Sequence, residues 1–409
     1  MERAHTMAKT LLNLQDVHVR RGMNTVLQGC SLQVDSGQTV VLTGANGTGK
    51  STLLEAAVGL LPLENGTVVH GEVEVADAEG RRRASPLTVG MVLQKNGMVG
   101  GEIVSEHLDC AMSMSGFRID AAPFLEAFNL THRANELVAH LSQGQARKVA
   151  VLAGLLPAFA SPTPALVLLD EPDAGLDEAS IEALCRWLDE LRAGGHAVVL
   201  ATHDRRLVDH ATHLMDVAEG RVEAAEPPQV NTADRSRTPS NPTGRSAWGV
   251  RMHLRTMMWL NTNGMAGLLT LGVLLALGSF MDGLDAMQQL GFILAPTMAV
   301  GLCGEPLVAA LREERTSTWW RAVAGGEPHA GWLPFALGFV VTLLSATALH
   351  DGLETTTLLV GAGLCGVVWH GVGWLQRSTQ RLARPQAVFV GLLTPVLILP
   401  YSLLLGVLS

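Results

Sequence analysis

Short apolar runs and amphipathic stretches alternate along residues 8–220. Apolar runs bounded by turn residues are typical of buried strands, and helical stretches lie between them. The predicted strands are Leu11–Val19, Thr39–Thr43, Gly90–Leu93, Ala165–Asp170 and His196–Thr202. This alternation favours an α/β domain with a mainly parallel sheet and helices on its faces.

The pattern changes twice beyond residue 220. Residues 221–247 are rich in Pro, Ser, Thr, Asn and Arg, with almost nothing apolar to bury, which predicts a flexible linker. Residues 248–409 are strongly apolar and contain five runs near the ~20 residues that a helix needs to cross ~30 Å of hydrocarbon. These runs lie at about 264–281, 290–311, 331–349, 357–376 and 386–408. We therefore expect an all-α membrane domain of about five transmembrane helices.

The net charge of −9 is not spread evenly over the 409 residues. From Trp248 onward the chain has eight arginines, no lysine and eight acidic residues, so the acidic excess lies in the first half. An acidic soluble half argues against a nucleic-acid partner, which needs a basic face. The five cysteines are scattered without a C-x-x-C pair, so neither a zinc site nor a disulfide framework is indicated.

The arginines of the second half predict its orientation. The N-terminus lacks the pattern of a signal peptide, so we place the α/β domain in the cytoplasm. All eight arginines then fall on the cytoplasmic side of the predicted spans, whereas the outer loops are acidic. The positive-inside rule describes this distribution. We expect a multi-pass protein of the cell inner membrane.

Residues 44–51 read GANGTGKS and match the P-loop pattern G-x-x-x-x-G-K-[ST], between a predicted strand and a predicted helix. Its glycines let backbone N–H groups point at a phosphate, and the helix N-terminus adds a favourable dipole. We expect Lys50 to bridge the β- and γ-phosphates of ATP and Ser51 to ligate Mg²⁺. The predicted nucleotide-binding residues of this segment are Gly44, Asn46, Gly47, Gly49, Lys50, Ser51 and Thr52.

The segment ALVLLDEP, residues 165–172, is a buried strand that ends in two carboxylates. Asp170 is placed to hold Mg²⁺ through water. Glu171 is placed to polarise the attacking water as a general base. An apolar run followed by Asp-Glu is weak on its own, but after a P-loop it strongly indicates an ATPase.

Residues 141–145 read LSQGQ and precede the strand at Leu166 by 25 residues. LSGGQ-like pentapeptides in this position mark the ATPases of ABC transporters, which this chain resembles. The resemblance implies that Ser142, Gly144 and Gln145 cap the γ-phosphate of ATP held by a second ABC subunit. Because one P-loop is present and the motifs are complete, it also implies a half-transporter that works as a homodimer.

Three more segments carry the same resemblance. Gln94 in VGMVLQKNG matches the Q-loop, which senses the γ-phosphate and Mg²⁺. Asp177 ends DAGLD, which matches the D-loop, and His203 in VVLATHD matches the switch histidine that contacts the γ-phosphate. The aromatic residue that stacks adenine in most of the family is missing upstream of the P-loop. Arg20 or Arg21 could stack instead, and we expect modest discrimination between ATP and GTP.

The segments RRGMNTVLQGCSL, LTGANGTGKSTLL and LSQGQARKVAVLAGLL resemble the heme-exporter ATPase of cytochrome c maturation more narrowly. The second half resembles a shortened form of that system's permease. This resemblance implies export of a hydrophobic solute such as heme, with heme-handling membrane proteins as partners. Two alternatives stay open: an ABC-2-type drug or lipid exporter, and a mechanochemical complex that acts on a partner protein without moving a solute.

The second half offers several candidate functional residues. The segment 312–330, with Trp319 and Trp320, is either a coupling helix that docks beside Gln94 or part of an interfacial aromatic belt. Glu305 and His370 lie within predicted spans, where ionisable groups either line a functional path or make a helix-packing hydrogen bond. His350 is a candidate heme ligand, although an ordinary loop histidine is the more common case.

Overall fold

The structure is a computed structural model that describes residues 9–228, 247–277, 286–314, 316–349 and 354–378, with Val390 and Thr394. The chain forms two compact units. Unit 1 consists of Met1–Ser246 and Glu314–Glu327, and unit 2 consists of Ala247–Glu313 and Pro328–Ser409. A short piece of the second half of the sequence therefore belongs to the unit formed by the first half.

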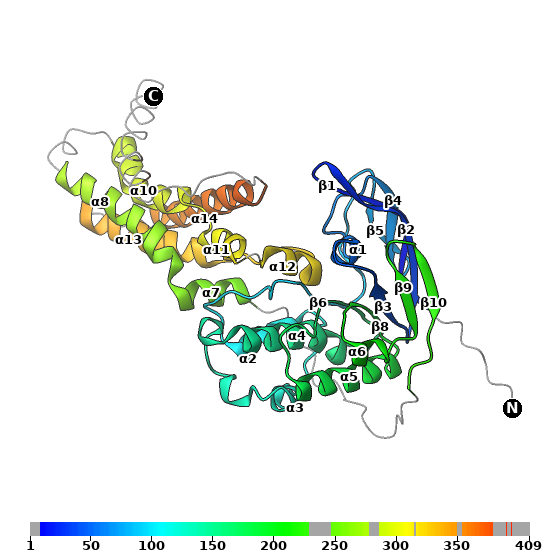
Figure 1. The fold of residues 1–409 in the computed structure, drawn as a ribbon. Helices are drawn as coiled ribbons and strands as arrows, with labels where there is room; N and C mark the ends of the chain where they lie inside the picture. Colours follow the sequence, from blue (N-terminus) through cyan, green and yellow to red (C-terminus); the bar gives the residue numbers. More distant parts are fainter. Residues whose placement is uncertain are drawn as a thin grey trace. The chain divides into compact units, whose positions relative to one another are not determined.

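A six-stranded sheet forms the centre of unit 1, in the order β10-β9-β3-β8-β7-β6 (Figure 1). All neighbours pair in parallel except β10 with β9. The strands are β3 (Thr39–Thr43), β6 (Val89–Val92), β7 (Leu166–Asp170), β8 (Ala197–Ala201), β9 (His213–Asp216) and β10 (Arg221–Ala224). Every residue of β6, β7 and β8 is buried, as expected for parallel strands covered on both faces. The predicted α/β domain with a mainly parallel sheet is confirmed.

A second, antiparallel sheet has the order β2-β1-β4-β5. Its strands are β1 (Thr10–Arg21), β2 (Asn24–Asp35), β4 (Asn65–His70) and β5 (Val73–Asp77). Only β1 corresponds to a strand predicted from the sequence. Its pairing with β2 shifts register between Leu14 and Val17, and Asp16 has a positive φ of 48°. Such bulges interrupt the alternation of apolar and polar residues by which strands are recognised.

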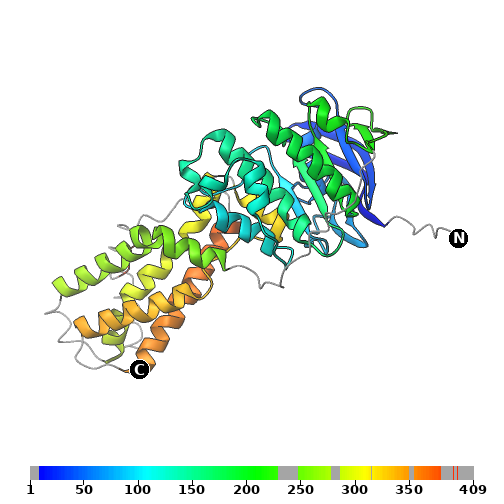
Figure 2. The same ribbon diagram turned by 90° about the horizontal axis from the view of Figure 1, so that it is seen from below.

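Helices cover the six-stranded sheet of unit 1, and two views show their arrangement (Figures 1 and 2). Helix α1 contacts strands of both sheets, whereas α4 packs on β6 and β7 and α5 packs on β8. The helices are α1 (Lys50–Ala57), α2 (Val104–Ser113), α3 (Ala122–Ala127), α4 (Gln143–Ala160), α5 (Glu178–Ala193), α6 (Arg205–Val208) and α12 (Ser317–Ala324), with 3-10 turns η1 (Thr131–Arg133) and η2 (Val138–His140). 

The boundary that we predict after residue 220 needs correction. Residues Arg221–Ala224 form β10, which pairs in antiparallel register with β9, so they extend the sheet and are not linker. Their side chains are exposed, and β10 lies at the edge of the sheet. Exposed polar residues on an edge strand look like linker in sequence, which explains the error. Residues 229–246 of the predicted linker lie outside the described residues.

Unit 2 is helical in its described residues. Its elements are α7 (Trp248–Thr256), the π-helix η3 (Leu260–Gly264), α8 (Met265–Ala276), α10 (Ala286–Leu302), α11 (Pro306–Glu313), α13 (Leu333–Leu349) and α14 (Thr355–Ser378). Helix α14 packs against α13, α10 and α11, and α10 also packs against α8 and α13. Small residues permit this close packing: a Cβ added at Gly361 would lie 1.9 Å from Thr342 Oγ1. Close approach at small residues is how helices associate in membranes.

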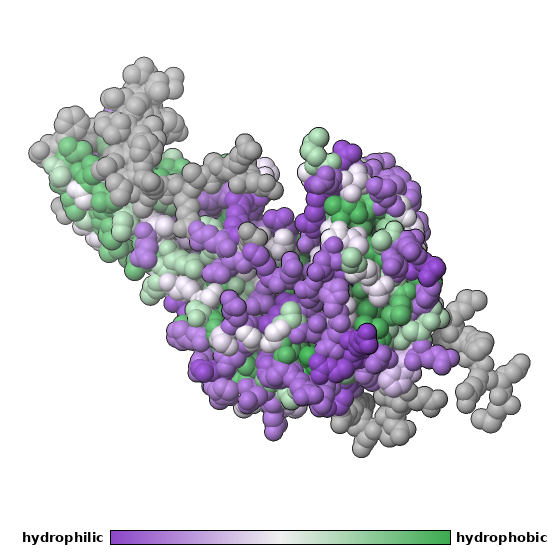
Figure 3. Space-filling view, viewed as in Figure 1, coloured by the Kyte–Doolittle hydropathy of each residue, from purple (hydrophilic) through white to green (hydrophobic). Residues whose placement is uncertain are grey.

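Within the described residues, two helical segments are long and apolar enough to cross a membrane, namely 288–313 and 355–378. A third span is possible if 248–256 and 260–276, which meet at 58°, count as one. Helix α13 is apolar but shorter, and the predicted run 386–408 lies outside the described residues apart from two positions. Hydrophobic surface covers the region of α8 (Figure 3), where Leu268 and Leu275 are exposed. These helices are consistent with a membrane domain.

The second predicted span, 290–311, is not one regular helix. Its α-helical hydrogen bonding is interrupted between α10 and α11, where Gly304 has a positive φ of 66°. Buried Asn263 donates hydrogen bonds of 2.9 Å from its side-chain nitrogen to the carbonyls of Val300 and Gly304. These bonds give hydrogen-bond partners to carbonyls near the break. Such partners are needed where no water is present to bond the backbone.

We predict that His196 makes unit 1 less stable in mild acid. Its Nδ1 accepts a 3.0 Å hydrogen bond from the Ala165 amide, and burial lowers the pKa of His196 from 6.5 to about 4. Between these two pKa values only the unfolded chain takes up the proton. The contribution of His196 to the free energy of unfolding is therefore fully present above about pH 6.5. Between about pH 6.5 and about pH 4, the free energy of unfolding falls by about 1.4 kcal/mol for each pH unit.

The variant His196→Asn keeps an acceptor for the Ala165 amide but does not titrate. Hydrogen exchange of the β7 and β8 amides in the full-length protein reports the free energy of opening, and the two proteins are compared at equal pH. Between about pH 7 and about pH 5, this free energy should fall by about 2 kcal/mol more in the wild type than in the variant. Equal pH dependence in both proteins would contradict this assignment.

Candidate functional site

The P-loop connects β3 to α1, as its motif predicts. Gly44, Gly47 and Gly49 have positive φ values of 126°, 86° and 103°, which favour glycine. A Cβ added at Gly49 would also lie 2.9 Å from the Leu27 side chain. Lys50 Nζ donates hydrogen bonds to the carbonyls of Gly44 (2.8 Å) and Ala45 (3.0 Å). The loop conformation therefore holds the ammonium group of Lys50 over the backbone that would surround a phosphate.

Ser51 and Asp170 come together from different elements. Ser51 lies in the first turn of α1, Asp170 ends β7, and the Ser51 hydroxyl donates a 3.0 Å hydrogen bond to Asp170 Oδ1. Burial raises the pKa of Asp170, and this hydrogen bond opposes the shift. A hydroxyl and a carboxylate are the hard oxygen ligands that Mg²⁺ prefers. The donor set at this position therefore fits Mg²⁺.

Glu171 has an unusual backbone conformation. Its φ is +47°, a region that non-glycine residues seldom occupy, and its amide donates a 2.9 Å hydrogen bond to the Ala201 carbonyl on β8. Such strain persists where surrounding bonds fix the backbone, and it is frequent at functional sites. Glu171 lines a cavity of about 530 Å³ together with Gln94 and Gly144.

Arg147 fixes this backbone, a role that the motif analysis misses. Its Nη2 donates to the carbonyls of Asp170 (2.6 Å) and Glu171 (2.7 Å), and its Nη1 donates to the Leu93 carbonyl (2.6 Å). The guanidinium is buried in α4 and joins the end of β7 to the residue before Gln94. A sequence signal did exist, because a buried charge inside the apolar helix ARKVAVLAGLL needs partners.

His203 and Asn46 bring the end of β8 to the P-loop. His203 Nε2 lies 3.2 Å from Asn46 Oδ1, so the predicted switch histidine contacts a predicted nucleotide-binding residue. The neighbouring Thr202 hydroxyl donates a 2.6 Å hydrogen bond to Asp173 Oδ1 of the DAGLD segment. These contacts connect the two loops that follow β7 and β8 with the P-loop.

The LSQGQ segment starts α4 through a capping box. Ser142 Oγ accepts from the Gln145 amide (3.3 Å), and Gln145 Oε1 accepts from the Ser142 amide (3.0 Å). The pair satisfies two amides of the first turn, and Gly144 lies beside the Gly175 carbonyl. The structure thus gives the Gln145 side chain a capping role besides the nucleotide contact that we predict for it.

Asp177 also has a structural role in this structure. It caps α5 by accepting a 2.9 Å hydrogen bond from the Ser180 amide, and it pairs with Lys148 Nζ at 2.5 Å. The hydrogen bond from Lys148 is the main cause that lowers the pKa of Asp177 to about 2. The predicted D-loop carboxylate is therefore ionised and tied to the helix that follows LSQGQ.

Most of the predicted residues form two groups within unit 1, and Glu171 and Gln94 line a cavity together with Gly144 of the second group. The P-loop group joins Lys50, Ser51, Asp170, Asn46 and His203 through the contacts above. The pentapeptide group contains Ser142, Gly144, Gln145 and Asp177. Among the described residues, no hydrogen bond joins Ser142, Gly144 or Gln145 to the P-loop. 

The adenine-stacking arginines that we predict are both ion-paired. Arg20 pairs with Glu64 (3.1 Å) and Arg21 pairs with Glu55 (2.6 Å). Both arginine side chains are about half exposed. At the turn between β1 and β2, Met23 is 95% exposed, which is unusual for a large apolar side chain.

Helix α12 carries the predicted coupling tryptophans and belongs to unit 1. Trp319 is 2% exposed, and its Nε1 donates a 3.0 Å hydrogen bond to the Met91 carbonyl on β6. Gly97 provides the space, since a Cβ there would lie 2.9 Å from Trp319 Cβ. Met91 and Gly97 flank Gln94 in sequence. Because Trp320 is buried as well, the structure favours docking beside the Q-loop over an exposed aromatic belt.

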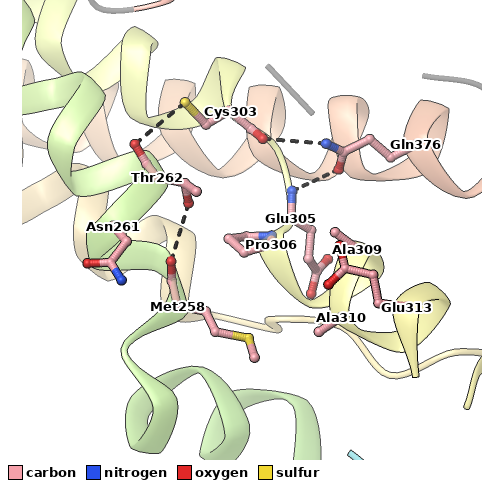
Figure 4. A pocket seen from close by; sticks show the side chains of 10 residues that line it. All are labelled: Met258, Asn261, Thr262, Cys303, Glu305, Pro306, Ala309, Ala310, Glu313 and Gln376. Carbon is pink, nitrogen blue, oxygen red and sulfur yellow. Dashed lines mark hydrogen bonds between the residues drawn. The ribbon is translucent and has the colours of Figure 1, made fainter. Parts of the chain in front are cut away.

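In unit 2, Glu305 lines a cavity of about 280 Å³ between η3, α11 and α14 (Figure 4). The carboxylate is buried, pairs with Arg377 at 2.8 Å, and lies 3.8 Å from His253 Nε2. Its amide donates a 2.9 Å hydrogen bond to Gln376 Oε1. His370 Nε2, on α14, lies 3.0 Å from the carbonyl of Gly331 in the turn before α13. His350 lies outside the described residues.

We predict that Arg147→Lys slows hydrolysis while nucleotide still binds. Lysine cannot donate from one rigid fork to three separate carbonyls, so Glu171 would lose its fixed position. Hydrogen bonds from charged groups contribute about 1.5–3 kcal/mol each, so turnover should fall about tenfold or more. ATPase turnover and ATP affinity measured side by side test this. Arg186→Lys on the exposed face of α5 is the control, and unchanged turnover in Arg147→Lys would refute the assignment.

Comparison with known proteins places these motifs in one family. The sequence model of the ABC transporter family matches residues 27–174. The chain is 36% identical over 197 residues to the cytochrome c biogenesis ATP-binding export protein CcmA of Gluconobacter oxydans, covering 47% of this chain and 81% of that protein. It is 35% identical over 216 residues to an ABC transporter ATP-binding protein of Halobacterium salinarum, covering 50% of this chain and 90% of that protein.

Other similarities are more partial. The chain spans 62% of the length of two uncharacterized ABC transporter ATP-binding proteins of Mycobacterium tuberculosis, to which it is 32% identical over 210 residues. The solved ATP-binding subunit of an ABC transporter has a TM-score of 0.44 and 26% identity, covering 53% of this chain and 89% of that chain. By its similarity of 35–36% identity to relatives of which it covers 81% and 90%, this chain belongs to the ABC transporter ATP-binding family, and its first half is an ABC-type ATPase domain.

Proposed function

We propose that this chain is one half of an ATP-driven exporter of the cell inner membrane. ATP hydrolysis in unit 1 would drive movement of a hydrophobic solute through a membrane domain formed by unit 2. One observation carries the proposal: an ABC ATP site and helices of membrane-spanning length occur in a single chain. The docking of α12, which comes from the second half of the sequence, into unit 1 gives a physical route for coupling.

The ATP site supports hydrolysis by a general base. The P-loop amides and Lys50 would hold the phosphates, and Ser51, Asp170 and Gln94 would hold Mg²⁺, which compensates the charge that develops on them. Glu171 follows directly on Asp170 and would orient and deprotonate the attacking water. His203, next to Asn46, would contact the γ-phosphate.

A second copy supplies what one copy lacks. Ser142 and Gly144 begin a helix, where backbone amides and the helix dipole favour an anion. Since no hydrogen bond of the described residues brings them to the P-loop of their own copy, we infer that they face the P-loop of another. Two identical chains would then form two equivalent sites, each with residues from both. 

Heme is the solute that the similarity supports best. The relative from Gluconobacter oxydans is named as an ATP-binding export protein of cytochrome c biogenesis, and the resemblance of the P-loop and LSQGQ regions points the same way. Heme-handling membrane proteins would be the natural partners. The ABC-2-type drug or lipid exporter and the mechanochemical complex use the same ATP site and differ in what unit 2 contacts.

We expect Glu171→Gln to abolish turnover and to trap ATP-bound dimers. Removing a general base costs about 10²–10⁴-fold in rate, while the phosphate contacts remain intact. Turnover and the dimer fraction with ATP, measured by light scattering in detergent, report the two effects. Glu182→Gln, an exposed change on α5, serves as the control. Near-normal hydrolysis in Glu171→Gln would sink the assignment of the base.

Transport into inverted membrane vesicles separates the exporter from the mechanochemical complex. The exporter should accumulate labelled heme with ATP, and Lys50→Ala should not, because it loses the phosphate-binding ammonium. Active hydrolysis without accumulation of heme, together with a stable membrane partner in a pull-down, would favour the mechanochemical alternative. Accumulation of a labelled lipid or drug instead of heme would favour the ABC-2-type exporter.

A further inference from the structure

A cavity of about 440 Å³ lies in unit 1, away from the P-loop residues. Its walls come from the C-terminal end of α1, from β4 and β5, from the loop 78–88 and from α12. Three arginines line it, Arg82 and Arg83 on the loop and Arg321 on α12. All the lining residues belong to the described part of unit 1, and none of them is acidic. A concave site with one sign of charge attracts ligands of the opposite sign.

The loop and α12 are adjacent in the folded unit. Arg82 forms a β-bridge with Ala76, and the Arg83 amide donates a 3.0 Å hydrogen bond to the Val75 carbonyl, so β5 holds the loop in place. Gly325 ends α12 with a φ of 70°, and a Cβ added there would lie 3.2 Å from Ala84 Cβ. The three arginines are therefore presented by two segments with fixed backbones.

Two of the three guanidinium groups have no carboxylate partner. Arg321 pairs with Glu327 at 2.8 Å, whereas the ion pairs of the described residues include neither Arg82 nor Arg83. Arg82 Nη1 does donate to the Gly59 carbonyl, which leaves most of its five N–H donors for a ligand. Burial and the nearby charge of Arg321 lower the pKa of Arg82. Bringing like charges together costs free energy unless an anion compensates it.

Arg81, in the same loop, differs from Arg82 and Arg83 in having carboxylate partners. It precedes Arg82 directly, yet its guanidinium pairs with three carboxylates, those of Glu74, Asp77 and Glu79. Two other polar side chains of the cavity lining, those of His70 and Ser85, are hydrogen-bonded within the protein. Because His70 Nε2 donates to the Ala57 carbonyl, its Nδ1 accepts from Ser85 Oγ at 2.8 Å. Among the residues that line the cavity, all of them described, the guanidinium groups without a carboxylate partner are those of Arg82 and Arg83.

We propose that this cavity binds a phosphate monoester, held by Arg82 and Arg83 on one side and Arg321 on the other. A phosphate monoester carries a charge of about −1.5 to −2 near pH 7, which matches the two guanidinium groups that have no carboxylate. The planar fork of arginine binds phosphate oxygens bidentately. A bound phosphate would join α12 to the loop and strengthen the attachment of α12 to unit 1.

Such a phosphate could belong to a lipid headgroup or to a soluble metabolite. Six residues separate Arg321 from Pro328, where the chain enters unit 2 and its membrane-length helices. Clusters of basic residues that lie next to a membrane helix on its cytoplasmic side bind anionic lipid headgroups. Phosphatidic acid and glycerol 3-phosphate present the same phosphate monoester, one from a bilayer and one from solution.

Hydrogen exchange of the full-length protein in phosphatidylcholine nanodiscs tests the site. Phosphatidic acid added to the nanodiscs, or glycerol 3-phosphate added to the buffer, should slow exchange in both 78–88 and 317–325. Protection by phosphatidic acid alone assigns the lipid, and protection by both assigns any phosphate monoester. Slowing confined to the P-loop, residues 44–51, or no slowing by either ligand, would overturn the proposal. The readout needs no ATP hydrolysis, so it is independent of the proposed exporter function.

Variants identify the arginines. In Arg82→Gln/Arg83→Gln the ligand concentration for half-maximal protection should rise about tenfold or more, because two charge-assisted contacts are lost. Arg82→Lys/Arg83→Lys keeps the charge but loses the forked guanidinium. Its ligand concentration for half-maximal protection should lie between those of the Gln variant and the wild type. The control Arg186→Gln/Arg221→Gln removes two exposed charges elsewhere in unit 1 and should behave as the wild type. Equal binding by the Arg82→Gln/Arg83→Gln variant and its control would exclude the site.

Discussion

The hydrogen bonds of Arg147 hold the catalytic region of unit 1 together. One buried guanidinium reaches the carbonyls of Leu93, Asp170 and Glu171, and so connects α4, the end of β7 and the segment that leads to Gln94. Burying a cation costs free energy unless its donors have hydrogen-bond partners. Separating these segments would leave the guanidinium of Arg147 without partners, and this opposes their separation. The helix that begins at LSQGQ is thereby tied to the carboxylate that would activate water. A shift of any one of these segments would therefore break or move the hydrogen bonds of Arg147 to the other two.

The same constraint, that buried polar groups need partners, shapes unit 2. The break at Gly304 leaves backbone carbonyls without their regular helical partners, and Asn263 from the π-helix η3 bonds those of Val300, in α10, and of Gly304 itself. The break in turn places buried Glu305 beside Arg377 and near His253. Irregular backbone is tolerated at membrane depth where it is covered by protein or lines a cavity. Here both conditions hold, because the break lies beside the cavity of Figure 4.

The elements that could be predicted from the sequence are those in which binding a phosphate allows few residue types. Strand, P-loop and helix were predictable together because the glycines, Lys50 and Ser51 have few substitutes at a phosphate site. Sequence reasoning failed for β4 and β5, whose short alternations resemble loops, and for β10, whose exposed side chains resemble a linker. The charge of Arg147 within an apolar helix is visible in sequence, but its role is not, because its partners are backbone carbonyls of distant segments. The packing of Trp319 against Gly97 was equally hidden, since residues more than 200 positions apart give no local signal.

The position of α12 has a consequence for coupling. The segment Glu314–Glu327, which contains α12, is continuous in sequence with unit 2 at Glu313 and Pro328, whereas Trp319 is buried in unit 1 and hydrogen-bonded to β6. Burying one tryptophan side chain is worth a few kcal/mol, comparable to the free energies that separate conformational states. The segment 314–327 is therefore packed within unit 1 and covalently continuous with unit 2 at both ends. Since Met91 and Gly97 lie on either side of Gln94, any nucleotide-dependent shift of Gln94 would act on α12 at its most buried contact.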